Sequence, residues 1–165
     1  MNLSGRRRAE GLQIERKFLV DPSRVPAAAK TGGSRFAQGY LSLEPTVRVR
    51  RSERDDEPAR PWITVKVPGG LSRAEFEYPI PADDATAMMD LCVAVLSKTR
   101  YRVPVGAHVW DLDAFDAPFP DLWLAEIELD RPDEHFTRPE WLGDEVTDDP
   151  RYSNAAIALA GHRRR

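Results

Sequence analysis

Residues 13–20 read Gln-Ile-Glu-Arg-Lys-Phe-Leu-Val, and their alternation is typical of the segments that predict the fold. Ile14 and Phe18 occupy even positions, whereas Glu15 and Lys17 occupy odd ones. Successive side chains of a β-strand point to opposite faces, so residues two apart share a face. The stretch therefore predicts an amphipathic strand with one apolar face and one charged face.

Similar segments recur along most of the 165-residue chain, separated by clusters of Pro, Gly and Asp. Helical spacing with acids in the first turn predicts a helix over residues 81–96, and a second, short helix is predicted over residues 152–161. The remaining periodic segments predict eight strands, at residues 13–20, 35–43, 46–52, 61–67, 73–80, 98–105, 108–115 and 122–130.

The segments between these elements read as turns and loops. Residues 53–60 are charged and contain Pro, which predicts a mobile hairpin loop, and residues 68–70 read Pro-Gly-Gly, which predicts a tight connection. No internal repeat or domain boundary interrupts the pattern. We therefore expect one domain over residues 1–165, mainly β (α+β), folded as a closed or nearly closed antiparallel β-barrel with flanking helices. Residues 1–11 and 162–165 are expected to be flexible tails.

The composition narrows the class of protein. With 24 basic and 27 acidic residues the formal net charge is −3, which does not favour a nucleic-acid binder. No apolar run approaches the roughly 18 residues that a membrane span needs. The single cysteine, Cys92, cannot form an internal disulfide, so the cytoplasm is the expected compartment.

Charged residues of like sign occupy one parity of several predicted strands. Either these faces lie on the outer, solvated surface of a sheet, or they line the interior of a barrel, and periodicity alone does not decide between the two. Basic side chains in an interior suit phosphoryl oxygens, and carboxylates suit a hard divalent metal. The charged sets are Glu15 and Lys17, Arg48 and Arg50, Lys66, Glu75 and Glu77, Lys98 and Arg100, Asp111 and Asp113, and Glu126 and Glu128.

The same segments resemble a known family, the CYTH domain of the triphosphate tunnel metalloenzymes. Its signature, Glu-x-Glu-x-Lys, lies at the start of the first strand and resembles residues 13–17 here. Further blocks follow in the order of the family and cover nearly the whole chain. These blocks are residues 47–50, 64–66, 75–77, 98–101, 110–115, 125–129, 146–147 and 151–154.

The resemblance implies a closed eight-stranded antiparallel tunnel, a divalent metal cofactor, either Mg²⁺ or Mn²⁺, and a substrate with a linear triphosphate. Short bacterial members are similar to inorganic triphosphatases, so the resemblance implies metal-dependent hydrolysis of inorganic triphosphate or a related organic triphosphate. Two alternatives stay open. One is a class IV adenylate cyclase, in which a ribose hydroxyl attacks the α-phosphate, and the other is a non-catalytic protein that binds polyphosphate or nucleotide.

The resemblance also implies roles for individual residues. Glu75, Glu77 and Lys98 are the implied catalytic residues. The implied metal ligands are Glu15, Asp113, Glu126, Glu128 and Gln13. The implied phosphate-binding residues are Lys17, Arg48, Arg50, Lys66, Lys98, Arg100 and Arg151.

One position departs from the family signature. Gln13 stands where the family has its first Glu, and an amide oxygen contributes no formal charge to a cation site, which predicts weaker metal binding. This substitution motivates the non-catalytic alternative. A homodimer through an outer apolar strand face is a further hypothesis, which no motif supports. The non-phosphate part of a substrate does not follow from these residues.

Overall fold

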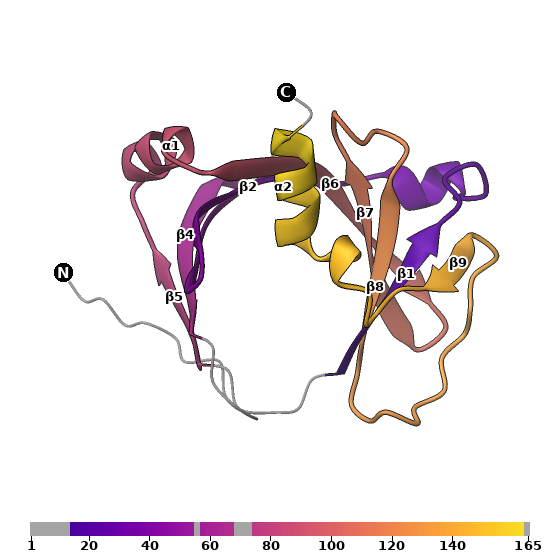
Figure 1. Cartoon of the computed structure of the whole chain (residues 1–165). Helices are drawn as coiled ribbons and strands as arrows, with labels where there is room; N and C mark the ends of the chain where they lie inside the picture. Colours follow the sequence, from indigo (N-terminus) through magenta and orange to yellow (C-terminus); the bar gives the residue numbers. More distant parts are fainter. Residues whose placement is uncertain (1–13, 55–56, 68–73, 164–165) are drawn as a thin grey trace.

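The computed structural model describes residues 14–54, 57–67 and 74–163 (Figure 1). Two α-helices, α1 (Ala82–Asp90) and α2 (Asn154–His162), and two 3-10 turns, η1 (Ala27–Lys30) and η2 (Pro150–Tyr152), accompany one antiparallel sheet. The strands are β1 (Ile14–Val20), β2 (Ser34–Leu43), β3 (Thr46–Arg54), β4 (Glu57–Val67), β5 (Ala74–Pro79), β6 (Ala94–Val105), β7 (His108–Phe115), β8 (Trp123–Leu129) and β9 (Leu142–Glu145).

The sheet is strongly curved but does not close, so the expected closed eight-stranded barrel is wrong. The described residues form nine strands in the order β5-β4-β3-β2-β6-β7-β8-β1-β9. The outer edge of β1 pairs with β9, with Phe18 opposite Glu145 and Val20 opposite Leu142, so β1 does not meet β5. Figure 1 shows β4 and β5 facing β1 and β8 across the interior of a C-shaped sheet.

Two predicted boundaries are also corrected. The helix predicted over residues 81–96 ends at Asp90, because Val95 pairs with Gly39 of β2 as part of strand β6. The apolar spacing of residues 91–96 suits a helix and a strand equally, and pairing with β2 decides for the strand. Most of the predicted loop over residues 53–60 is strand, since Arg54 of β3 pairs with Glu57 of β4.

The chain ends differ from the expected tails in one respect. His162 is the last residue of α2 and therefore belongs to a helix. The predicted tail over residues 1–11 and the predicted turn over residues 68–70 lie outside the described residues. The second predicted helix, over residues 152–161, corresponds to α2, whose N-terminal residue follows the capping Ser153.

The apolar parity of β1 and β6–β8 forms the main core on the convex side of the sheet. Phe18 and Trp110 are completely buried there, with ring centroids 5.7 Å apart in an edge-to-face contact. Val25 lies in the segment between β1 and β2, and Trp141 lies in the segment between β8 and β9. Both side chains pack onto this core. The convex side is therefore sealed by connecting segments, and the charged parity is left to the concave side.

Helix α2 covers part of the concave side. Its buried Ile157 and Ala158 pack against a cluster that includes Tyr40, Leu96 and Leu124. Figure 1 shows α2 lying within the curve of the sheet, whereas α1 lies outside it. The apolar end of the concave face is thereby covered, and its charged end remains accessible. No helix within residues 14–54, 57–67 and 74–163 has the length and apolar character to cross a membrane.

Candidate active site

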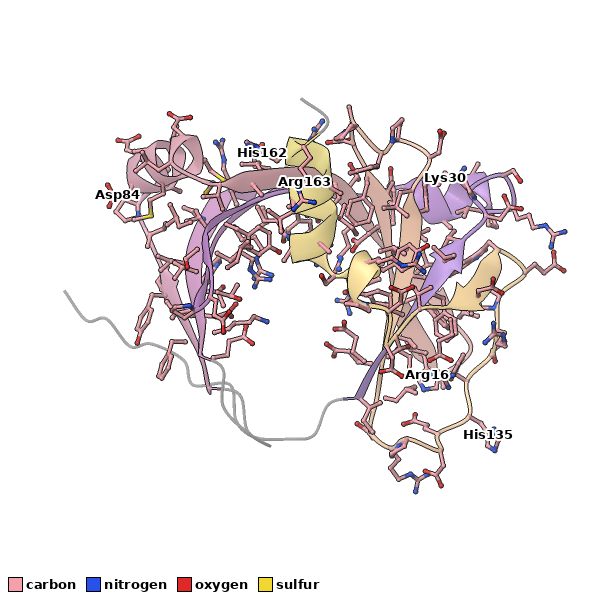
Figure 2. The ribbon with its side chains drawn as sticks, in the orientation of Figure 1. Arg16, Lys30, Asp84, His135, His162 and Arg163 are labelled. Atoms are coloured by element: carbon pink, nitrogen blue, oxygen red, sulfur yellow. The ribbon has the colours of Figure 1, made fainter. Side chains whose placement is uncertain are left out.

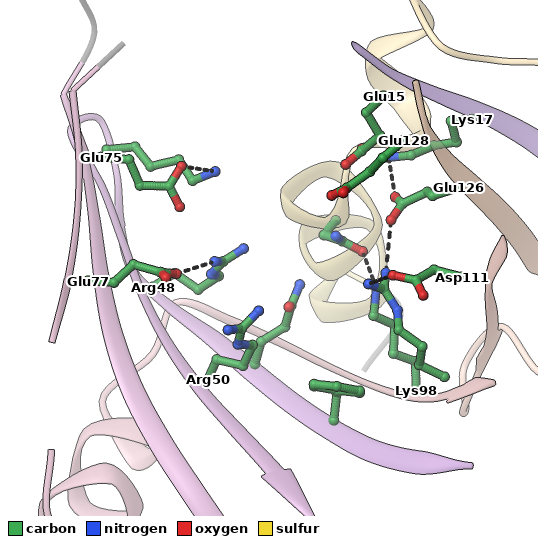
Figure 3. A pocket seen from close by; sticks show the side chains of 15 residues that line it. Glu15, Lys17, Arg48, Arg50, Glu75, Glu77, Lys98, Asp111, Glu126 and Glu128 are labelled. Atoms are coloured by element: carbon green, nitrogen blue, oxygen red, sulfur yellow. Dashed lines mark hydrogen bonds and ion pairs between the residues drawn. The ribbon is translucent and has the colours of Figure 1, made fainter. Parts of the chain in front are cut away.

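The concave face holds a pocket of about 320 Å³ whose lining is almost entirely charged (Figure 3). Six basic and six acidic side chains contribute, together with one aromatic residue and two neutral amides. Figure 2 shows the interior side chains gathered between the two walls of the sheet, while Lys30, Asp84 and His135 lie on the outside. The lining residues are Glu15, Lys17, Phe36, Gln38, Arg48, Arg50, Lys66, Glu75, Glu77, Lys98, Arg100, Asp111, Glu126, Glu128 and Asn154.

One wall of the pocket, called here the arginine wall, consists of β3, β4 and β5. The register places Lys66 opposite Glu75, and their charged atoms lie 3.2 Å apart. Arg48 lies 3.7 Å from Glu77 and donates a 3.3 Å hydrogen bond to Thr64 Oγ1. Each acid of β5 therefore holds one basic side chain, Glu75 that of Lys66 on the adjacent β4 and Glu77 that of Arg48 on β3.

Arg50 differs from the other bases of the arginine wall. Within the described part of the chain, no hydrogen bond or ion pair reaches its guanidinium group, although the side chain lines the pocket. Burial, together with the positive charge of Arg48, lowers the pKa of Arg50. Arg48 Nε is likewise buried without a hydrogen-bond partner. A bound anion would accept hydrogen bonds from unsatisfied cationic donors of this kind.

The facing wall, called here the carboxylate wall, consists of β6, β7, β8 and β1. Arg100 is its hub and donates to both oxygens of Asp113 at 2.7 Å, to Asp111 at 2.7 Å and to Glu126 at 2.8 Å. Lys17 lies 3.0 Å from the other oxygen of Glu126. Every basic group named in this wall therefore has a carboxylate partner.

Asp113 lies behind the carboxylate wall and holds two bases at once. It is 1% exposed, and its Oδ2 accepts a 2.5 Å hydrogen bond from Lys98 Nζ. Burial opposes the charge of Asp113, but hydrogen bonds from Arg100 and the charge of Lys98 outweigh it and lower its pKa. Burial lowers the pKa of Lys98, with Asp113 opposing. For Arg100, the carboxylates outweigh burial and raise the pKa.

The chain is similar in sequence to proteins that act on inorganic triphosphate. The CYTH domain matches residues 11–154. This chain belongs to the CYTH domain family. It is 38% identical to an inorganic triphosphatase of Acetivibrio thermocellus over 152 residues, covering 89% of this chain and 93% of the relative. It is 37% identical to an inorganic triphosphatase of Nitrosomonas europaea over 162 residues, covering 90% and 97%.

A solved structure agrees with the CYTH assignment. The crystal structure of an inorganic triphosphatase superposes on this fold with a TM-score of 0.67 at 28% sequence identity. The match covers 89% of this chain and 94% of that chain. The curved antiparallel sheet with its two helices is therefore the CYTH fold.

The CYTH pocket offers donors that suit a hard divalent cation. Glu15, Asp111, Glu126 and Glu128 line a second, adjoining hollow at the carboxylate wall. Desolvation by neighbouring side chains and the charges of Glu126 and Glu128 raise the pKa of Glu15, although Lys17 opposes this. A divalent cation would relieve this crowding of carboxylates, so the donor set fits a metal.

Within the described ranges, however, no three His, Cys, Asp or Glu side chains are already arranged to hold a metal ion. Glu126 is engaged by Lys17 and Arg100 on its two oxygens. Glu126 would therefore hold a metal only through an oxygen that already contacts Lys17 or Arg100.

The structure brings most of the predicted site residues together. Arg151 is an exception, because its side chain is 80% exposed, pairs with Asp149 and does not line the pocket. Asp113 supports Lys98 and Arg100 from behind instead of lining the pocket. Gln13 lies outside the described residues.

Four lining residues were absent from the predicted site. Asp111 belongs to the charged parity and Asn154 to the family block of residues 151–154, but neither has a predicted role, and no pattern singles out Phe36 or Gln38. Gln38 shares the parity of the buried Tyr40 and is 2% exposed, so a polar residue on a buried parity is the signal that identifies it.

Proposed function

We propose that this CYTH protein is a metal-dependent phosphohydrolase that cleaves inorganic triphosphate into diphosphate and phosphate. The observation that carries the proposal is the pocket itself, which places six bases and six acids around one space of about 320 Å³. A short, linear, highly charged anion suits such a lining, and the inorganic triphosphatases among the relatives support the choice.

The bases of both walls bind the phosphoryl oxygens. Arg50 presents free donors to the pocket in its present position, and Arg48 lines the pocket beside it. Lys66, Lys17, Lys98 and Arg100, which also line the pocket, complete the set. Phosphoryl transfer depends mainly on such positioning and charge neutralisation.

CYTH enzymes are metal-dependent, and Mg²⁺ or Mn²⁺ is the ion that we propose here. Glu15, Glu126 and Glu128 would hold it, with Gln13 as a further proposed contributor, whereas both oxygens of Asp113 already accept hydrogen bonds from Lys98 and Arg100. When bound, such an ion neutralises phosphoryl oxygens and makes a water molecule more acidic. Glu75 and Glu77 keep Lys66 and Arg48 in place and are proposed to position the attacking water.

The reaction adds water to the terminal phosphorus and breaks its bond to the bridging oxygen. We propose that Lys98 neutralises the negative charge that develops on the departing diphosphate. Arg151, which pairs with Asp149 outside the pocket, would reach the substrate only after leaving that partner. Among the described residues that line the pocket, Phe36 is the one aromatic side chain, and its ring centroid lies 5.9 Å from the Arg100 guanidinium, so this lining does not favour the cyclase alternative.

Phosphate release from inorganic triphosphate tests the proposal. The assay contains Mg²⁺ or Mn²⁺, with a parallel sample in EDTA and a second parallel sample in which ATP is tested for cyclic AMP formation. We expect phosphate release with either metal and none in EDTA. Cyclic AMP without phosphate release from triphosphate would support the cyclase, and tight binding without turnover of either compound would support the non-catalytic alternative.

A further inference from the structure

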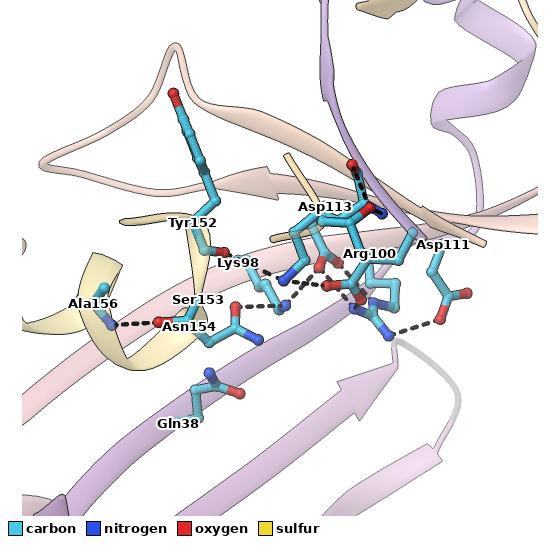
Figure 4. Close-up of polar contacts among 12 residues, drawn as sticks. Gln38, Lys98, Arg100, Asp111, Asp113, Tyr152, Ser153, Asn154 and Ala156 are labelled. Carbon is cyan, nitrogen blue, oxygen red and sulfur yellow. Dashed lines mark hydrogen bonds and ion pairs between the residues drawn. The ribbon is translucent and has the colours of Figure 1, made fainter. Parts of the chain in front are cut away.

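The C-terminal segment contacts two lysines of the pocket (Figure 4). Lys98 Nζ donates a 3.2 Å hydrogen bond to Asn154 Oδ1. Lys17 Nζ donates a 3.2 Å hydrogen bond to the backbone oxygen of Tyr152. Both acceptors are neutral and both come from residues 152–154. The two lysines lie on strands β1 and β6, but residues 152–154 provide some of the acceptors that hold their ammonium groups.

Lys98 is the more confined of the two lysines. Its side chain is 4% exposed, and its ammonium lies 2.5 Å from Asp113 Oδ2 and 5.4 Å from the centroid of the Phe115 ring. Asp113 and Asn154 accept two of its three N–H groups. A buried ammonium that loses an acceptor keeps an unsatisfied donor, which is costly in free energy.

The position of Asn154 is set by helix α2. Ser153 Oγ caps the helix by accepting a 3.2 Å hydrogen bond from the backbone N–H of Ala156. Ile157 and Ala158 anchor the helix in the apolar cluster on the concave face. Asn154 therefore reaches the pocket from a helix that packs on β6, the strand that carries Lys98.

We propose that Asn154 is a positioning residue for substrate binding: its side-chain oxygen holds the Lys98 ammonium in the pocket, so that α2 supplies part of the phosphate site. This inference rests on the proposed function, because it assigns Asn154 to the same site. A neutral amide is suited to the task, since it fixes Lys98 without cancelling its charge. Two carboxylates on Lys98 would leave less positive charge for a phosphoryl oxygen.

A double-mutant cycle on the full chain tests this role. Asn154→Ala, Lys98→Ala and the double variant are compared for their affinity for inorganic triphosphate, measured by calorimetry in EDTA so that metal-dependent hydrolysis cannot proceed. Hydrogen bonds to charged groups suggest a loss of about tenfold for Asn154→Ala. If Asn154 acts through Lys98, the same substitution in the Lys98→Ala background costs less than about twofold.

His162→Ala is the matched control. His162 is exposed at the end of α2 opposite to Asn154, so we expect an unchanged triphosphate affinity. In turnover assays with metal, Asn154→Ala should raise KM more than it lowers kcat. Equal losses of affinity in His162→Ala and Asn154→Ala, or additive losses in the cycle, would overturn the assignment.

The two proposals fail in different ways. Triphosphate that binds with the expected non-additive losses but is never hydrolysed overturns the proposed activity and supports the role of Asn154. Hydrolysis with additive losses does the reverse. A folded wild-type chain that does not bind triphosphate overturns both.

Discussion

The two walls of the pocket carry similar charges but use them differently. In the carboxylate wall, Arg100 donates hydrogen bonds to three carboxylates. Lys17 and Lys98 each form an ion pair with one carboxylate. In the arginine wall, Arg50 has no such partner among the described residues and Arg48 keeps an unsatisfied Nε. The bases of the carboxylate wall are therefore all paired without a ligand, whereas Arg50 in the arginine wall would gain its partner from an anion.

Because of this difference, we expect one wall to contribute mainly to the stability of the fold and the other mainly to the binding of an anion. Paired, buried charges are costly to break and contribute to holding the wall together. An unpaired, partly buried cation contributes little to the free energy of unfolding, but it favours any anion that satisfies it. Removing one partner of a buried pair in the carboxylate wall should therefore lower the free energy of unfolding, and substitutions of Arg50 should weaken binding.

The largest expected effect is that of Asp113→Ala. This substitution removes the acceptor shared by the buried Lys98 and Arg100, and breaking such a pair costs about 3–5 kcal/mol of unfolding free energy. Urea unfolding followed by Trp fluorescence measures it. Asp116→Ala is the control, because its ion pair with Arg35 is exposed and should contribute less than about 1 kcal/mol. Equal losses of unfolding free energy at the two positions would contradict the stabilising role of the carboxylate wall.

Next in size is the effect of Arg50→Ala on substrate binding. Loss of charge-assisted hydrogen bonds should raise KM for inorganic triphosphate by about tenfold or more, with the unfolding free energy unchanged or slightly increased. Arg51→Ala is the matched control, since Arg51 follows on the opposite face of β3 and pairs with Glu53. An unaffected KM in Arg50→Ala would mean that this guanidinium does not meet the substrate.

A smaller effect is expected at the residue that precedes β1. Gln13→Glu restores the carboxylate of the family signature and adds a charge on the parity of Glu15. We expect the metal concentration for half-maximal activity to fall by about threefold to tenfold, because hard cations gain affinity from added carboxylate charge. Gln13→Ala, which removes the oxygen donor, should change it in the opposite direction. Identical metal requirements in all three proteins would show that this position is irrelevant to the metal.

The smallest effect concerns an ion pair outside the pocket. Arg16 hydrogen-bonds Glu145 of β9 and lowers the pKa of that carboxyl to about 2. Because the folded pKa lies below the unfolded value of 4.5, the pair stabilises the fold above pH 4.5, and this stability is lost as the pH falls toward 2. The pair is partly exposed, so Glu145→Gln should cost less than about 1 kcal/mol at pH 7 and nothing near pH 2. Thermal unfolding at the two pH values measures the difference.

The charged lining was predictable because it depends on local periodicity. Arg48 and Arg50, or Glu126 and Glu128, share a face in any strand, and the order of family blocks indicated that this face points inward. The partner of each charge was not predictable, because it depends on cross-strand register. Arg100 reaches Asp111 and Asp113 on one neighbouring strand and Glu126 on the next, and these contacts require the whole sheet.

Local periodicity of the sequence does not predict that the sheet stays open or that residues 142–145 form a ninth strand. Strand β9 has the sequence Leu-Gly-Asp-Glu, which shows no alternation, and only its pairing with β1 makes it a strand. That pairing occupies the edge a closed barrel needs. Asn154 was missed for a similar reason, since a single amide at a helix start has no periodic signal and its contact with Lys98 is long-range.

The most direct test of the central claim compares phosphate release by the wild-type chain and by Arg50→Ala over a range of inorganic triphosphate concentrations with Mg²⁺ or Mn²⁺. We predict metal-dependent release of phosphate by the wild-type chain and, at equal folded fraction, a curve shifted to higher triphosphate concentration by about tenfold in the variant. No release by the folded wild-type chain with either metal, or superimposable curves for the two proteins, would contradict triphosphate hydrolysis in this pocket.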